Sequence, residues 1–297
     1  MAVKNQVLSG AKARARTAEP GKGIQWGKVI RYTAVVFVVL VSLGPLYWTV
    51  VTSVKSGIEL NLSPPTLFPH SFSFENYAND LSLSTFTRDL LNSAIIATIT
   101  TILALTVGIL CAYAIARTKF RGKSIVLGIT LSVTMIPLIA LVGPLFVIFT
   151  GPLPVYNTYT ALIIPDLATS LPITVWFMTS FFRDLPPDLE EAARVDGATR
   201  MRALWEIIVP LTAPGVFAAA ILSFIAVWND FLFGLTLTID EHAQPVTVGI
   251  TRFNGEHTIP WGEIAAAAVI VTIPLVIVVL FLQKRIVSGL TAGAVKG

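Results

Sequence analysis

The sequence predicts an all-α membrane protein with six transmembrane helices and both termini in the cytoplasm. Hydrophobic residues make up 54% of its 297 residues and charged residues only 13%, whereas a soluble domain carries about 25% charged residues. Six stretches are apolar and long enough to cross the ~30 Å hydrocarbon core as helices of about 20 residues. Eighteen of the 21 basic residues fall in segments that these crossings place on one side, and the positive-inside rule makes that side cytoplasmic.

The six spans follow from the apolar runs in chain order. The charge-free run from 124 to 165 is too long for one helix, and the turn-forming cluster around Pro152 and Pro154 divides it. The fifth run contains a single charged residue, Asp230. No backbone group can stay unpaired in lipid, so each run is expected to be helical. The expected spans are residues 32–54, 90–116, 124–149, 160–182, 212–238 and 264–283.

The segments outside the membrane differ in composition. Residues 1–28 are basic and polar without apolar periodicity, which predicts a disordered cytoplasmic lead before the membrane domain of residues 29–297. The external segment 55–89 is rich in Pro, Ser and Asn, and its aromatic residues suggest a compact loop near the lipid headgroups. Residues 239–263 are expected to form the second external loop.

Several chemistries are excluded by what the sequence lacks. The single cysteine, Cys111, allows neither an internal disulfide nor a cysteine metal cluster, and the three histidines are too scattered for a metal site. A phosphate-binding loop needs a glycine five residues before its Gly-Lys-Ser, but before Gly122 that position holds Arg117. No catalytic residue set is found, so the chain is not expected to be an enzyme or to bind a cofactor or metal.

The cytoplasmic segment 183–210 has the pattern of two short helices joined by a glycine turn. After a proline pair, Asp188 can cap the first helix, and Glu191 three residues later completes a capping box. Gly197 can supply the left-handed turn that ends this helix. Thr199 can then cap the second helix.

The second short helix is expected to have one apolar face. Its apolar residues have the spacing i, i+3, i+4 and i+7, namely Met201, Leu204, Trp205 and Ile208, and Pro210 closes the segment. The segment could be a plain connector that lies on the protein's own membrane surface. A connector needs neither two caps nor the small residues Ala192 and Ala193, so docking to a cytoplasmic partner is favoured.

Several motifs together resemble one transporter family. Glu191-Ala192-Ala193, Gly197 after three further residues and Val209-Pro210 after eleven more resemble the EAA loop of ABC importer permeases, although the family usually has Leu where this chain has Val209. The other matching motifs are Asn92-Ser93, the run 112–117, Trp228-Asn229-Asp230 and the tail 289–297. Over about residues 30–297 the chain resembles the second permease subunit of maltose/trehalose-type carbohydrate importers.

This resemblance implies a type I ABC importer permease fold and a mechanism. In that family the EAA helix sits in a cleft of an ATPase subunit, and ATP-driven closure of two ATPases switches the membrane cavity from inward- to outward-facing. The implied partners are a second six-span permease, two ATP-binding cassette subunits that hold ATP and Mg²⁺, an extracytoplasmic sugar-binding protein and the bilayer of a bacterial inner membrane, with no nucleic acid. The implied ATPase-coupling residues are Glu190, Glu191, Ala192, Ala193, Asp196, Gly197, Met201, Leu204 and Pro210. Tail residues implied to contact the ATPase are Thr291, Gly293, Lys296 and Gly297.

Polar groups inside the spans are candidates for the solute pathway, because ionisable residues at membrane depth usually face a cavity or a partner. Trp228, Asn229 and Asp230 form an aromatic, amide and carboxylate set suited to a sugar, although Asp230 could instead tie two spans together. Asn92 is a further pathway candidate and is expected near the membrane interface. Asp166 is expected to be a solvated residue at a helix entry.

Three other functions remain open at this stage. An ion-coupled secondary transporter needs acidic or histidine relays across several helices, and only two acidic residues lie within the spans. An intramembrane enzyme needs a nucleophile–base or metal set at depth. An ABC permease for another solute, such as glycerol phosphate, glucosylglycerol, an amino acid or a peptide, is separated from a sugar permease only by the resemblance.

Overall fold

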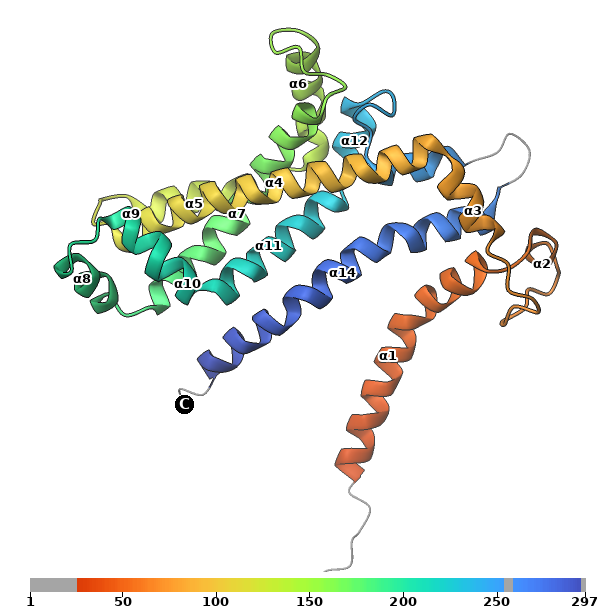
Figure 1. The fold of residues 1–297 in the computed structure, drawn as a ribbon, viewed down its shortest axis with the longest axis horizontal. Coiled ribbons are helices and arrows are strands. Elements are labelled where there is room, and N and C mark those ends of the chain that lie inside the picture. The colour runs from red at the N-terminus through yellow and green to blue at the C-terminus, as the bar shows by residue number, and fades with distance from the viewer. Residues whose placement is uncertain (1–25, 254–258, 295–297) are drawn as a thin grey trace, which may run out of the picture. The chain divides into compact units, whose positions relative to one another are not determined.

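The computed structural model describes residues 26–253 and 259–294, which form helices and turns without any strand (Figure 1). The chain divides into two compact units, residues 1–48 and residues 49–297. Five helices are long: α1 (Trp26–Ser53), α4 (Ser84–Arg117), α7 (Tyr159–Asp184), α11 (Ala213–Trp228) and α14 (Trp261–Ala294). The remaining elements are α2 (Gly57–Leu60), α3 (Glu75–Ser82), α5 (Lys123–Val133), α6 (Leu138–Thr150), α8 (Asp188–Val195), α9 (Arg200–Ala203), the π-helix η1 (Leu204–Ile208), α10 (Val209–Leu211), α12 (Leu232–Leu237), α13 (Val246–Gly249) and the 3₁₀-helix η2 (Ile250–Phe253).

Four helical stretches are long and apolar enough to cross a membrane, and the number rises to six if each of two bent helix pairs is one span. The predicted continuous helix over 124–149 is wrong, because α5 and α6 meet at a bend of 87°. Pro137 causes this break, since it has no N–H to donate and disfavours helical backbone at Ile136. A second bend, of 81°, separates the helical residues 200–211 from α11 at Thr212. The predicted fifth span 212–238 is also interrupted, because residues 229–231 lie between α11 and α12.

The core of residues 49–297 forms around α4, α7 and α11. Helices α4 and α7 share the most extensive helix–helix contact in this unit. Gly108 permits their close approach, because a Cβ atom there would lie 2.6 Å from the Thr174 Cγ2 atom. Buried apolar clusters occur along this contact, one around Trp228 and Phe149 and another around Met178 and Phe182.

The segment 239–253, predicted as an external loop, is anchored on α4 by polar contacts. The Asn92 amide donates to the backbone oxygens of Glu241 (2.8 Å) and Gln244 (2.9 Å). The Val246 N–H donates to the Ser93 hydroxyl (2.8 Å). Arg252 donates to a buried oxygen of Asp89 (2.9 Å). The Asn92-Ser93 pair therefore positions this segment on the membrane domain.

The segment after α1, which was predicted to be external, folds around Glu59, whose side chain is buried. Its carboxylate accepts hydrogen bonds from the Thr66 hydroxyl (2.6 Å) and the His70 N–H (3.1 Å). The Thr66 hydrogen bond lowers the pKa of Glu59 most strongly, against the opposing effect of burial. In the same region the Asn76 amide donates to the backbone oxygens of Ser53 and Lys55, which fixes α3 against the end of α1.

Candidate functional site

The first candidate site is the helix α8, whose cap lies one residue earlier in the chain than the predicted cap, Asp188. The predicted cap by Asp188 is wrong: Pro187 occupies the cap position, and its backbone oxygen accepts from the N–H groups of Glu190 (3.0 Å) and Glu191 (3.2 Å). Pro187 has helical backbone angles, so the helix can start there without a side-chain cap. The acidic residues of the first turn, Asp188 among them, still favour this end of the helix through its dipole.

The turn after α8 forms as predicted. Gly197 has a φ of 86°, in the left-handed region. Its N–H donates to the Arg194 oxygen (3.1 Å), and the Ala198 N–H donates to the Ala193 oxygen (2.9 Å), which together form a Schellman motif. The Thr199 hydroxyl then accepts from the Arg202 N–H (3.2 Å), so its predicted cap is confirmed.

The residues after Thr199 divide between two faces rather than forming the single apolar face that was predicted. Leu204 and Ile208 are buried against α4 and α7, whereas Met201 and Trp205 are about half exposed. The π-helical hydrogen bonding of η1 changes the angular spacing of these residues. Pro210 does not end the segment, because helix α10 contains it and the chain turns only at Thr212.

Two hydrogen bonds connect the start of the segment 183–210 to α4. The Tyr113 hydroxyl donates to the Glu190 carboxylate (2.6 Å), and Arg117 donates to the Leu185 backbone oxygen (2.9 Å). Tyr113 and Arg117 belong to the sequence motif 112–117, which predicted no role for either residue. Their contacts link the segment 183–210 to the long helix α4.

The outward face of α8 is exposed. Glu191, Ala192, Asp196 and Gly197 are exposed, whereas Ala193 packs inward with 6% of its surface accessible. Val195 is 88% exposed and was not predicted as a contact residue. The exposed part of α8 and its turn therefore combines one apolar side chain with small residues and carboxylates.

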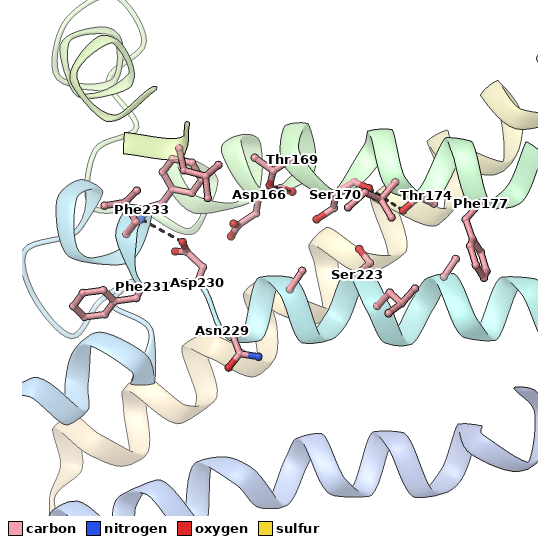
Figure 2. A pocket seen from close by; sticks show the side chains of 16 residues that line it. Asp166, Thr169, Ser170, Thr174, Phe177, Ser223, Asn229, Asp230, Phe231 and Phe233 are labelled. Carbon is pink, nitrogen blue, oxygen red and sulfur yellow. Dashed lines mark hydrogen bonds between the residues drawn. The ribbon is translucent and has the colours of Figure 1, made fainter. Parts of the chain in front are cut away.

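The second candidate site is a cavity of about 560 Å³ between α7, α11 and the start of α12 (Figure 2). This volume is within the range of roughly 300–1,000 Å³ typical of small-molecule sites. Most of the lining is apolar. The polar residues that line it are Asp166, Thr169, Ser170, Thr174, Ser223, Asn229 and Asp230.

Two aspartates point toward one another across this cavity (Figure 2). Asp230 lies in the break between α11 and α12, and its carboxylate accepts from the N–H groups of Phe233 (3.3 Å) and Gly234 (3.0 Å). Asp166 lies on α7 and is only 5% exposed, so its predicted solvated position is wrong. Because the helix places Asp166 on the inner face of α7, it faces Asp230 and not bulk water.

The structure does not bring all four predicted pathway residues together. Asn229 and Asp230 line the cavity, but Asn92 and Trp228 do not. Asn92 is fully buried and accepts from the Tyr159 hydroxyl (2.8 Å), so its amide is used inside the fold and does not face the cavity. Trp228 is 2% exposed and stacks on Phe224 with ring centroids 5.5 Å apart. Its indole is therefore part of the core, not a stacking surface in the cavity.

The four tail residues predicted to contact the ATPase lie in or beyond the last helix, α14. The backbone of Thr291 and Gly293 belongs to α14. Lys296 and Gly297 lie outside the described residues, as do residues 1–25 of the predicted lead.

Comparisons with known proteins extend over most of the chain. Residues 104–291 match the family described as binding-protein-dependent transport system inner membrane component. The chain is 43% identical over 273 residues to the trehalose/maltose transport system permease protein of Thermococcus litoralis, covering 91% of this chain and 97% of that protein. It is 39% identical over 271 residues to the sulfoquinovosyl glycerol transport system permease protein of Agrobacterium fabrum, covering 91% and 95%.

A solved structure with the same fold is a bacterial ABC transporter involved in the import of the acidic polysaccharide alginate. The match has a TM-score of 0.75 and covers 86% of this chain and 95% of that chain at 21% sequence identity. The helices around the cavity and the segment 183–210 thus belong to a fold that is also found in that transporter.

Proposed function

The chain belongs to the family of binding-protein-dependent transport system inner membrane components, and we propose that it is the permease subunit of an ATP-driven importer of a disaccharide such as trehalose or maltose. The observation that carries this proposal is the 43% identity to a trehalose/maltose permease along almost the full length of both proteins. The cavity supports it, since it combines apolar walls with carboxylate and hydroxyl groups.

The cytoplasmic segment from α8 to η1 is proposed to couple this permease to an ATPase subunit. The exposed face around Glu191, Ala192 and Gly197 would contact the ATPase. The buried face, with Leu204 and Ile208, and the Tyr113–Glu190 hydrogen bond would carry the movement into α4 and α7. ATP binding by the partner would then shift the permease between two states, as a ligand that binds one state better shifts any two-state equilibrium.

The rest of the assembly follows from the proposed role. Two ATPase subunits would hold ATP and Mg²⁺, and a second six-span permease would complete the membrane pathway. Both termini would lie in the cytoplasm, consistent with the distribution of basic residues. The opposite face, which includes the anchored segment 239–253, would then meet an extracytoplasmic sugar-binding protein.

The proposed function is tested by purifying the chain with its partner subunits and reconstituting the assembly in liposomes. ATP hydrolysis and sugar uptake are measured with trehalose, maltose and sulfoquinovosyl glycerol in the presence of the matching binding protein. The proposal expects one of these sugars to stimulate hydrolysis and to accumulate. Stimulation by an amino acid or a peptide, with none by the sugars, would assign the chain to another class of ABC permease.

A further inference from the structure

The cavity contains polar groups that no other part of the described chain satisfies. Among the described residues, the Asp166 Oδ2 atom has no hydrogen-bond partner although the residue is 95% buried. The Ser223 hydroxyl is in the same situation at 5% exposure. Both residues line the cavity, and Figure 2 shows both side chains directed into it. Buried polar atoms are nearly always paired in native proteins, so these two call for a ligand that can pair with them.

The two aspartates of the cavity differ in how they are held. Asp230 already caps α12 through the Phe233 and Gly234 N–H groups, which fixes its position. The Asp166 Oδ2 atom, in contrast, accepts no hydrogen bond from any described residue. Asp230 is therefore held by the protein, whereas the Asp166 Oδ2 atom is unpaired among the described residues.

The chemistry of the walls limits what the occupant can be. No group of three His, Cys, Asp or Glu residues that could hold a metal ion exists among the described residues. A lipid chain would leave the Asp166 carboxylate unpaired in an apolar site, at a high cost in free energy. A polyhydroxylated solute supplies hydroxyl donors for Asp166 and apolar ring faces for side chains such as Phe177 and Phe231.

We propose that this cavity is a solute subsite belonging to this chain, in which Asp166 is the principal acceptor for the hydroxyl groups of a sugar. Ser223 forms the second polar contact from α11, and Asp230 fixes the far wall. The proposal rests on the proposed sugar transport and adds to it that this subunit, through Asp166, contacts the solute directly.

The test uses a cysteine in the cavity of the assembled transporter. Cys111, the single native cysteine, is replaced by Ala, and Ser223→Cys introduces a thiol of similar size. A small methanethiosulfonate reagent labels this thiol, and the probe is the sugar that the wild-type assembly takes up. The proposal expects the sugar to slow labelling, and NaCl at matched osmolarity to leave it unchanged. Slowing by NaCl alone would indicate a cation site and overturn the proposal.

Asp166→Asn is then added to the same background. Loss of a hydrogen bond to a charged acceptor weakens binding about tenfold or more, so the sugar concentration that half-protects the thiol should rise by about that factor. If Asp166→Asn does not assemble, Asp166→Ala, which buries no polar group, replaces it. The matched control is Asp80→Asn, which changes a buried carboxylate without partners that lies on α3 and does not line the cavity. In the Asp80→Asn assembly, the sugar concentration that half-protects the thiol should equal that of the assembly carrying only Cys111→Ala and Ser223→Cys.

The outcomes separate this inference from the proposed function. An assembly that takes up none of the sugars contradicts both. Two results would contradict only the subsite. In the first, the assembly takes up a sugar, but that sugar does not slow labelling of the Ser223→Cys thiol. In the second, the sugar slows labelling, but replacement of Asp166 does not change the sugar concentration that half-protects the thiol.

Discussion

Replacement of Gly197 by Val is the sharpest test of the coupling role that we propose for residues 183–210, called the coupling segment below. Gly197 has a φ of 86°, and its N–H completes the Schellman motif that ends α8. A Cβ atom placed there would meet no atom within 4 Å. Any defect inside this chain therefore arises from backbone conformation and not from crowding.

The size of the effect follows from that conformation. A non-glycine residue in the left-handed region costs roughly 1–2 kcal/mol, and Val, which is β-branched, is expected at the upper end. Asn tolerates the same region better. Since about 1.4 kcal/mol is a factor of ten in an equilibrium constant, Gly197→Val should reduce the population of the correct turn about tenfold or more, and Gly197→Asn should reduce it less.

Gly122 provides a matched control. It has a φ of 94°, also has open space around its Cβ position, and precedes α5 in a different loop. Gly122→Val therefore carries similar backbone strain outside the coupling segment. Both variants should lower the thermal stability of the assembly by a similar amount. Only Gly197→Val should reduce co-purification of the ATPase and sugar uptake.

Two results would refute this reasoning. Normal uptake by Gly197→Val would show that the turn does not position a coupling surface. Equal loss of ATPase binding in the Gly122→Val and Gly197→Val assemblies would show that general instability, and not the coupling segment, causes the defect.

Three further predictions concern contacts inside the fold. Gly108→Ala should lower the melting temperature of the assembly, because the new methyl group would meet Thr174 Cγ2 and overpacking costs about 1–3 kcal/mol. Thr174→Ser removes that Cγ2 atom and should restore part of the lost melting temperature. If it restores none, the contact between Gly108 and Thr174 is contradicted. Tyr113→Phe removes a hydrogen bond to the Glu190 carboxylate, and such a bond to a charged group is worth about 1.5–3 kcal/mol. Because this bond is proposed to carry movement into α4, the number of ATP molecules hydrolysed per sugar imported should rise. An unchanged ratio would count against transmission through α4. Burial, aided by a nearby carboxylate, raises the pKa of Asp80 to about 7, so the folded state holds this proton more tightly than the unfolded chain, whose carboxyl ionises near pH ~4. The stabilisation from this proton is full below pH ~4 and is lost as the pH rises to about 7, so Asp80→Asn should gain melting temperature relative to wild type at pH 8 but not at pH 4; an equal difference at both pH values would exclude this titration.

Local patterns in the sequence predicted the helices and the glycine turn of the coupling segment. Apolar runs gave the positions of the long helices, and Gly197 and Thr199 adopt the roles expected from their types. The bend before Pro137 was missed because apolarity continues unbroken through it, and hydropathy does not report backbone direction.

Contacts between distant residues could not be predicted from one sequence. Asp166 and Asp230 face one another only because the inner face of α7 packs beside the break after α11 (Figure 2). Trp228 precedes this break and turns into the core instead. Asn92 satisfies the backbone of a segment about 150 residues later. Each of these placements depends on tertiary packing, which local periodicity does not encode.

We infer that this permease draws its energy from ATP hydrolysed by a partner chain. The most direct measurement compares solute accumulation in liposomes that contain the full assembly with liposomes that contain this chain alone, with and without a proton or sodium gradient. We expect accumulation only in the full assembly with ATP and binding protein. Uphill accumulation by the isolated chain on an ion gradient would contradict it.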